Sequence, residues 1–201
     1  MNQITTVVFD IGNVLAGFDW QEYLDSFGFS EQVKERIAKA TFLGQNWKEL
    51  DRGAKTDEEI YADCLREIPD LEKELSQVWQ GRLGIVKEYE YAADWILSLK
   101  QKGYRVYILS NYGVNTFAEA RRSFSFLQYA DGMVISYEIK HIKPEPEMYE
   151  ELIRRYDIKP EEAVFIDDLL PNIEAAVKKG FHVIPFTTKE EVDEKLAQML
   201  R

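Results

Sequence analysis

The sequence predicts an α/β protein whose parallel β-sheet is covered by helices on both faces and interrupted by an all-helical insertion. Three observations support this prediction. Short apolar runs that end at polar residues recur along the chain, helical patterns alternate with them, and residues 18–83 carry helix signals without a convincing buried strand. Strands that alternate with helices are typical of a parallel sheet with helices on both faces.

The first strand is expected at residues 4–9, because this run is short, apolar and rich in β-branched residues and stops at Asp10. Three later runs of the same kind predict strands at 104–109, 163–166 and 181–186. Helices are expected between the strands, at 86–102, 145–156 and 172–179. The first and third of these end at a glycine, and the second follows a proline, which are common signals of helix termini.

Within residues 18–83, several polar residues stand where helices would begin. Asp19 and Ser30 are expected as N-caps, and Thr56 with Glu59 has the spacing of a capping box. These signals predict a helical cap domain at 18–83. The core domain is then made of residues 1–17 and 84–201, and short hinges near Ala16 and Gly84 join the two.

The chain carries 36 acidic and 25 basic residues, a formal charge of -11. Such a surface repels nucleic acid and anionic lipid, so neither is expected as a partner. The N-terminal segment has no basic stretch followed by a long apolar run, and no run reaches 18 apolar residues, so a cytoplasmic protein is expected. The oligomeric state is left open.

Cysteine and histidine are scarce in this sequence. The single cysteine, Cys64, cannot form an internal disulfide and is expected to pack in a core. With His141 and His182 as the only histidines, a Ser-His-Asp triad or a multi-histidine zinc site lacks material. Carboxylates must therefore carry the chemistry.

Polar residues stand at the ends of the expected strands. Asp10, Ser110 and the pair Asp167 and Asp168 each follow an apolar run, and Lys143 precedes an expected helix. Ligands of open parallel sheets bind at the carboxyl ends of the strands. Each residue alone also fits a structural role, as a turn cap, a solvated lysine or a helix N-terminal acid. Together they predict phosphoryl transfer through a carboxylate, assisted by a divalent cation.

Four phrases, VVFDIGNVL, YILSN, HIKPEPEMY and VFIDDLLPNIEAA, resemble in order the four motifs of the haloacid dehalogenase superfamily. The resemblance implies a Rossmannoid core with a helical cap, a bound Mg²⁺ and an aspartyl-phosphate intermediate. The cap phrase WKELDRGAKTDEEIY is similar to a bacterial branch that includes alpha-D-glucose-1-phosphate phosphatase. The implied substrate is a small phosphorylated metabolite, with sugar phosphates as the favoured class.

The resemblance also implies roles for individual residues. Asp10 matches the nucleophile, Ser110 and Asn111 match the phosphate-binding second motif, and Lys143 matches the catalytic lysine, which also binds phosphate. The implied metal ligands are Asp10, Asp168 and the backbone carbonyl of Gly12. Around them, the implied supporting residues are Asp167 and Asn172.

Gly12 is a departure from the pattern, since most phosphatases of the superfamily have a second aspartate there as general acid and base. Proton transfer is worth about 10²–10⁴-fold in rate, so either a cap residue, the substrate or a water chain replaces this aspartate, or turnover is slow. Asp19 is a candidate because it lies near the hinge, although its role as a helix N-cap is the favoured interpretation.

Two other functions are compatible with this sequence. A metal-free dehalogenase of the same fold also uses an aspartate nucleophile. However, Asp167 and Asp168 beside Asp10 would crowd three carboxylates and raise their pKa values. Because of Gly12, a catalytically impaired module that binds a phosphometabolite is the second alternative.

The cap aromatics are expected to form a helix-bundle core more than a pocket; they are Trp20, Phe42, Trp47, Tyr61 and Trp79.

Overall fold

The computed structural model describes residues 3–199 and contains a central sheet of five parallel strands in the order β5-β4-β1-β6-β7. The strands are β1 (Thr6–Phe9), β4 (Arg105–Ser110), β5 (Gly132–Ile135), β6 (Ala163–Asp167) and β7 (His182–Pro185). β1 lies in the middle, and all four of its residues are buried. Its register places Phe9 beside Ile108 of β4 and Ile166 of β6, so the three strands end side by side.

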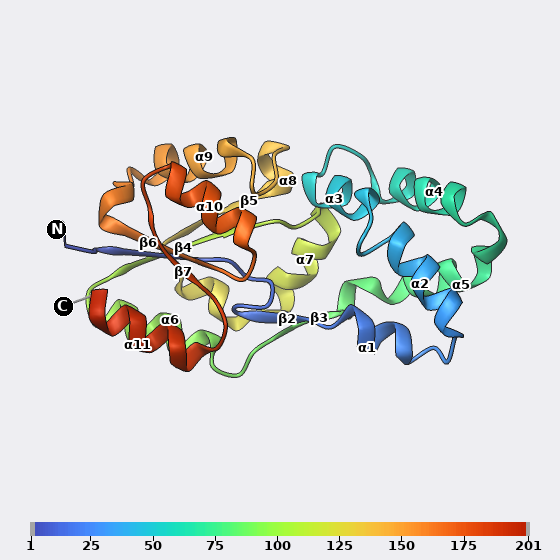
Figure 1. Cartoon of the computed structure of the whole chain (residues 1–201), viewed down its shortest axis with the longest axis horizontal. Coiled ribbons are helices and arrows are strands. Elements are labelled where there is room, and N and C mark those ends of the chain that lie inside the picture. The colour runs from blue at the N-terminus through green and yellow to red at the C-terminus, as the bar shows by residue number, and fades with distance from the viewer. Residues whose placement is uncertain (1–2, 200–201) are drawn as a thin grey trace.

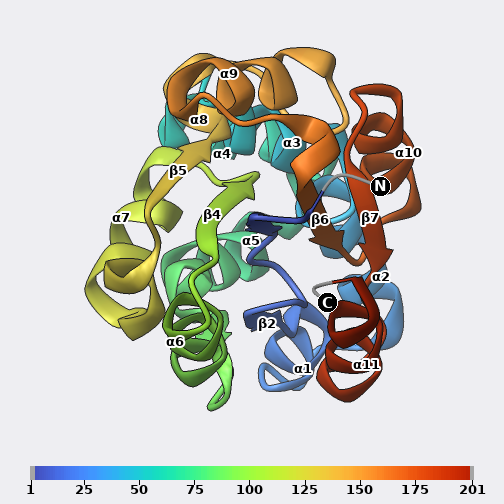
Figure 2. The same ribbon diagram turned by 90° about the vertical axis from the view of Figure 1, so that its left-hand side faces the viewer.

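Helices cover both faces of the sheet (Figure 2). One face packs against α6 (Ala92–Gln101), α7 (Val114–Ser123) and α11 (Lys189–Met199). The other packs against α9 (Pro146–Tyr156) and α10 (Leu170–Lys178). A short helix, α8 (Ser136–Ile139), follows β5. Residues on alternate sides of each strand therefore enter two separate apolar clusters, as period-two strand geometry requires.

An antiparallel ribbon of β2 (Ala16–Phe18) and β3 (Val86–Glu88) leads out of the core. Between the two strands the chain forms five α-helices, which are α1 (Trp20–Asp25), α2 (Glu31–Ala40), α3 (Gln45–Arg52), α4 (Asp57–Glu67) and α5 (Glu72–Gly81). These helices share an apolar cluster of their own. Figure 1 shows them beyond the end of the sheet opposite the two termini. Short 3-10 helices occur at Pro69–Leu71, Arg82–Gly84, Ser125–Tyr129 and Pro160–Glu162.

The expected fold class is confirmed: a helix-covered parallel sheet with a helical insertion after its first strand. Ser30 caps α2, and Thr56 with Glu59 forms the expected capping box of α4. Asp19 precedes α1, but its side chain makes no capping hydrogen bond. Cys64 is buried in the cluster of the insertion. The division into domains at 17/18 and 83/84 stays a prediction.

The helix expected at 86–102 is wrong in its first part, because residues 86–88 form β3 and the helix begins only at Ala92. Pairing with β2, some 70 residues earlier in the chain, overrides the local helical pattern. The sequence also did not predict β5, α7 or α11. β5 is a four-residue edge strand whose first two residues are only half-buried, so its apolar signal is weak.

Within residues 3–199, no helix is long and apolar enough to cross a membrane.

Candidate active site

The polar residues at the strand ends converge, as predicted. Asp10 follows β1, Ser110 ends β4, Asp167 ends β6, and Lys143 lies in the segment between α8 and α9. Together with Asp168 they surround or border a pocket of about 360 Å³ between the sheet and the helical insertion. The parallel register produces this convergence, because neighbouring strands end at the same edge of the sheet.

The carboxylate of Asp10 is held on one oxygen only. Its Oδ1 accepts hydrogen bonds from the Ile11 amide at 2.7 Å and the Ser110 hydroxyl at 2.6 Å, and it lies 2.8 Å from Lys143 Nζ. No donor among residues 3–199 is within hydrogen-bond distance of Oδ2. Asp10 also lines the pocket, so a fixed carboxylate offers one oxygen with unused lone pairs to a ligand.

Lys143 is buried, with 4% of its surface exposed, and its ammonium lies between Asp10 and Asp167 at 2.8 and 2.6 Å. Burial disfavours the charged form, but the two carboxylates outweigh it and raise the pKa of Lys143, so the ammonium is charged. Burial raises the pKa of Asp10 to about 7, against the opposing influence of Lys143. A divalent cation beside Asp10 favours its ionised form.

Asp167 and Asp168 have different environments. Asp167 is fully buried and accepts hydrogen bonds from Lys143, the Leu169 amide and the Asn172 side chain. Its lone pairs are therefore used within the protein. Asp168 is only half-buried, lines the pocket and accepts one hydrogen bond, from Asn13 Nδ2 at 3.0 Å.

Asp10, Asp167 and Asp168 each offer an oxygen atom within 4.8 Å of the others, which is the spacing of a cation site. Oxygen ligands are those that Mg²⁺ prefers. Gly12 lines the same pocket, and its carbonyl accepts no hydrogen bond from residues 3–199. These donors fit a hard divalent cation, with Asp167 the least available of the three carboxylates because its oxygens already bind protein groups.

The two asparagines act on their neighbours. Asn111 accepts a hydrogen bond from the Lys143 amide at 2.7 Å and donates one to the Lys143 carbonyl at 3.1 Å, which fixes the backbone of Lys143. Asn172 donates to both oxygens of Asp167 at 2.9 and 3.1 Å. Asn111 borders the pocket, but its side chain is largely engaged by Lys143.

The insertion supplies the far wall of the pocket. Of the five aromatics expected in the bundle core, Trp20, Phe42 and Trp47 pack in the cluster of the insertion and also line the pocket. Tyr61 and Trp79 pack in that cluster against each other, with ring centroids 5.7 Å apart, and do not line the pocket. The expected core packing is therefore confirmed, and the less favoured role in a pocket also applies to three of these rings.

Sequence reasoning also missed several pocket residues; those with polar side chains are Asp51, Arg82, Tyr112 and Thr116. Asp51 lies at the end of α3, and Tyr112 follows β4 by two residues. Only Tyr112 carried a signal, since it stands close to the strand-end motif YILSN. Asp51 is one of 36 acidic residues, and nothing in its local pattern separates it from solvated ones.

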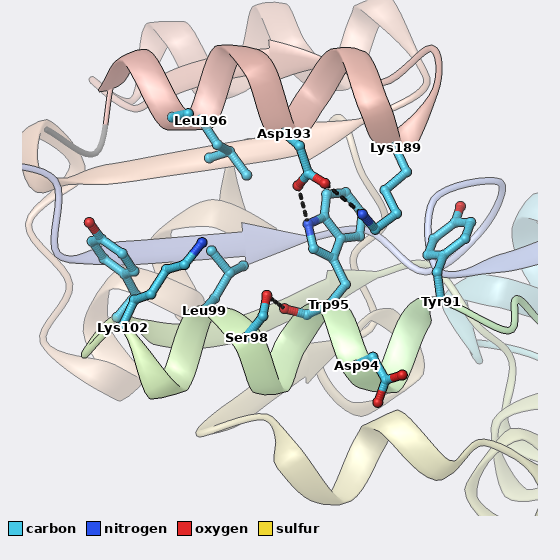
Figure 3. A pocket seen from close by; sticks show the side chains of 11 residues that line it. Tyr91, Asp94, Trp95, Ser98, Leu99, Lys102, Lys189, Asp193 and Leu196 are labelled. Carbon is cyan, nitrogen blue, oxygen red and sulfur yellow. Dashed lines mark hydrogen bonds and ion pairs between the residues drawn. The ribbon is translucent and has the colours of Figure 1, made fainter.

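A larger pocket, of about 590 Å³, lies between α6 and α11 (Figure 3). Four of its polar residues are engaged with one another. Asp193 accepts hydrogen bonds from Trp95 Nε1 at 2.7 Å and Lys189 Nζ at 2.5 Å, and the Ser98 hydroxyl donates to the Trp95 carbonyl. Unlike the smaller pocket, it is lined by none of the metal-capable groups found in residues 3–199.

The family model of haloacid dehalogenase-like hydrolases matches residues 4–180. The chain belongs to this family. The family predicted from the four motifs is thus confirmed, whereas the bacterial branch with alpha-D-glucose-1-phosphate phosphatase stays a prediction. Along this haloacid dehalogenase-like hydrolase, the strand-end residues follow one another in the order of the four motifs quoted above.

Characterised haloacid dehalogenase-like relatives include two phosphatases. A D-ribitol-5-phosphate phosphatase of Bacteroides thetaiotaomicron is 29% identical over 188 residues, which cover 89% of each chain. A sesquiterpene phosphatase of Aspergillus oryzae is 25% identical over 173 residues, covering 86% of this chain and 85% of the relative. The structure is also similar to a family enzyme of B. thetaiotaomicron, an aspartate-to-alanine mutant in complex with magnesium and inorganic phosphate. That comparison has a TM-score of 0.70 at 26% identity, covering 92% and 95% of the two chains.

Proposed function

We propose that this haloacid dehalogenase-like hydrolase is a magnesium-dependent phosphatase that hydrolyses a small phosphorylated metabolite through a phosphoaspartyl intermediate on Asp10. The observation that carries the proposal is the asymmetry of Asp10. Three donors hold its Oδ1, whereas no hydrogen bond from residues 3–199 reaches its Oδ2, and the residue lines the pocket. A carboxylate so oriented is prepared for attack on phosphorus.

The reaction has two halves. In the first, Asp10 Oδ2 forms a bond to phosphorus while the bond from phosphorus to the ester oxygen breaks. In the second, water attacks the phosphoryl group, the bond to Asp10 breaks, and inorganic phosphate leaves. Lys143 favours the ionised form of Asp10 and presents positive charge to the phosphoryl oxygens, and Ser110 can turn its hydroxyl from Asp10 to the phosphate.

Mg²⁺ held by Asp10, Asp168 and the Gly12 carbonyl would supply positive charge that neutralises the phosphate. Support comes from the three carboxylates with oxygen atoms within 4.8 Å of one another. The same cluster disfavours a metal-free dehalogenase. A cation-free nucleophile would lie beside two further carboxylates, and burial already raises the pKa of Asp10 to about 7.

We propose that the helical insertion, residues 18–83, acts as a cap that selects the substrate. Trp20, Phe42 and Trp47 form an apolar wall opposite Asp10, and Arg82 and Asp51 add charge. A pocket of about 360 Å³ suits a small metabolite. The relatives act on ribitol 5-phosphate and on a sesquiterpene phosphate, so sugar, polyol and prenyl phosphates are the classes to test first.

The test is phosphate release from p-nitrophenyl phosphate by the purified chain, with Mg²⁺ and with excess chelator. We expect hydrolysis only with Mg²⁺, and recovery when Mg²⁺ is restored. A chain that binds phosphate but releases none from this substrate would be the impaired binding module. Halide release from a 2-haloalkanoate without metal would identify the dehalogenase.

A further inference from the structure

The pocket lacks a side chain at the place where a proton is needed. The oxygen of a sugar or polyol is a poor leaving group unless it is protonated as its bond to phosphorus breaks, and Gly12 has no side chain to donate that proton. Among residues 3–199, the carboxyl groups that line this pocket belong to Asp10, Asp51 and Asp168. Asp10 is the proposed nucleophile and Asp168 a proposed metal ligand, which leaves Asp51.

Asp51 enters the pocket from the insertion, at the end of α3. The backbone amide of Gly113 donates a hydrogen bond to its carboxylate. Gly113 lies three residues after Ser110, in the loop that follows β4. A carboxyl group of the insertion is thus anchored to the loop that begins directly after Ser110 and contains Asn111.

The backbone around Asp51 is fixed to the core at successive residues. Ser136 donates its hydroxyl to the Asp51 carbonyl at 2.6 Å, and Arg52 binds Glu145 through two hydrogen bonds. The end of α3 also lies close to Gly113. A Cβ atom added to Gly113 would lie 2.9 Å from the Leu50 carbonyl oxygen. These contacts join the end of α3 to the core on both sides of the Asp51 side chain.

Tyr112 provides an independent sign that a ligand atom belongs in this part of the pocket. Only 6% of the surface of Tyr112 is exposed, and the residue lines the pocket. Among residues 3–199, no group is within hydrogen-bond distance of its hydroxyl. Burial and the nearby carboxylates of Asp10 and Asp51 raise the pKa of Tyr112, so the hydroxyl is a neutral donor. A buried donor without a partner is costly unless a bound oxygen atom accepts from it.

We propose that Asp51 is the general acid and base of the reaction and replaces the missing side chain at Gly12. This assignment rests on the proposed phosphatase function. In the first half, the Asp51 proton moves to the leaving oxygen as its bond to phosphorus breaks. In the second half, water forms a bond to phosphorus and gives its proton to Asp51, and the bond to Asp10 breaks. The catalyst is then restored.

The electrostatic environment of Asp51 suits both halves. Burial raises the pKa of Asp51 to about 7; the Gly113 hydrogen bond opposes this rise and the charge of Asp10 adds to it. The protonated and ionised forms are then both accessible near neutral pH, as an acid that becomes a base requires. Asp19, the candidate from the sequence, is exposed and does not line the pocket.

The test compares Asp51→Asn with Asp19→Asn and the wild type on p-nitrophenyl phosphate, phenyl phosphate and D-ribitol 5-phosphate, with saturating Mg²⁺. The oxide of p-nitrophenol leaves without a proton, whereas phenol and ribitol need one. In Asp51→Asn, kcat/KM should fall about 10²–10⁴-fold for phenyl and ribitol phosphates and less than about tenfold for p-nitrophenyl phosphate. Asp19→Asn should behave as the wild type does.

The second readout is the phosphoenzyme. Without a base for water, Asp51→Asn should release about one equivalent of p-nitrophenol in a burst and accumulate phosphate on Asp10, measured by acid quench and mass spectrometry. Thermal melting checks the fold; the Asn variant should be as stable as the wild type, since it removes a carboxylate whose ionisation burial opposes.

Three results would overturn the assignment. The first is an unchanged rate of Asp51→Asn on phenyl phosphate. The second is an equal loss on phenyl and p-nitrophenyl phosphates, which would indicate a positioning role. The third is a leaving-group effect in Asp19→Asn and not in Asp51→Asn. A wild type that neither hydrolyses p-nitrophenyl phosphate with Mg²⁺ nor forms a phosphoenzyme would instead overturn the proposed phosphatase function itself.

Discussion

Arg52, at the end of α3, donates two hydrogen bonds to the carboxylate of Glu145, the residue before α9, at 2.8 and 2.6 Å. This pair joins the helical insertion to the sheet domain one residue away from Asp51. Hydrogen bonds from Arg52 lower the pKa of Glu145 to about 2. The pair is partly exposed, so a contribution of about 1 kcal/mol to the free energy of unfolding is expected.

The first prediction concerns the pH dependence of this contribution. Because the pKa of Glu145 falls from 4.5 to about 2 on folding, the contribution is fully present above pH 4.5 and is lost as the pH falls toward 2. Glu145→Gln should therefore lower the free energy of unfolding at pH 7, and its difference from the wild type should shrink below pH 4.5. Urea titrations at pH 7 and at lower pH measure this, and a constant difference would contradict it.

The matched control is Asp70→Asn, which removes a similar arginine pair with Arg36 inside the insertion. It leaves the contact between insertion and core intact. Glu145→Gln should also lower kcat for phenyl phosphate, because the end of α3 is less firmly held, whereas Asp70→Asn should not. Equal effects of both variants on kcat would mean that the position of α3 does not depend on Glu145.

Asp10→Asn should abolish phosphatase activity and leave the fold intact, since it keeps the shape of the side chain and removes the nucleophilic charge. We expect the rate on p-nitrophenyl phosphate to fall to the uncatalysed level, with no phosphate recovered on residue 10 after acid quench. Circular dichroism and thermal melting serve as the folding controls. Turnover comparable to the wild type would remove Asp10 from the mechanism.

Asp168→Asn should weaken Mg²⁺ binding more than Asp167→Asn does. The carboxylate of Asp168 accepts one hydrogen bond and lines the pocket, whereas Asp167 already binds Lys143, Leu169 and Asn172. Asp167→Asn should instead lower stability by about 3 kcal/mol, because Lys143 loses one of its two buried partners. Calorimetric Mg²⁺ titration and urea unfolding separate the two effects. A reversed ranking would exchange their roles.

Lys143→Met keeps the length of the side chain and removes its charge. We expect kcat/KM to fall about 10²-fold or more with saturating Mg²⁺, because the ammonium both keeps Asp10 ionised and stabilises charge on the phosphoryl group. Lys159→Met, at an exposed lysine, is the control. If both variants retain wild-type kinetics, the charge of Lys143 is structural only.

Gly12→Asp tests whether the usual acid position of the family can be restored. A Cβ atom at Gly12 would meet no heavy atom within 4 Å, so the first atom of a side chain fits there. In the Asp51→Asn background, this change should raise kcat/KM on phenyl phosphate at least about tenfold over that of Asp51→Asn alone. In the wild-type background it should change little, because Asp51 already supplies the proton. A large gain in the wild-type background would mean that the natural enzyme lacks an acid.

Much of the fold and half of the site could be predicted from local patterns. An apolar run that ends at a carboxylate, as at Phe9 and Asp10, identifies both a buried strand and the residue at its end. Parallel sheets bring such ends together, so Asp10, Ser110 and Asp168 could be assigned to one site without coordinates. The capping box at Thr56 was likewise readable, because its hydrogen bonds join residues three apart.

Contacts between distant segments decided the rest. Residues 86–88 form a strand only because β2 is there to pair with them. Asp51 differs from the other acidic residues because Gly113, 62 positions later, donates to its carboxylate. In addition, Ser136 donates to its carbonyl, and Glu145 binds the next residue, Arg52. Local sequence records propensity and periodicity, whereas the burial and the raised pKa of Asp51 arise from surroundings that only the folded chain assembles. The sequence alone therefore predicted the fold and the proposed nucleophile, and the tertiary structure decided which carboxyl group of the insertion lines the same pocket.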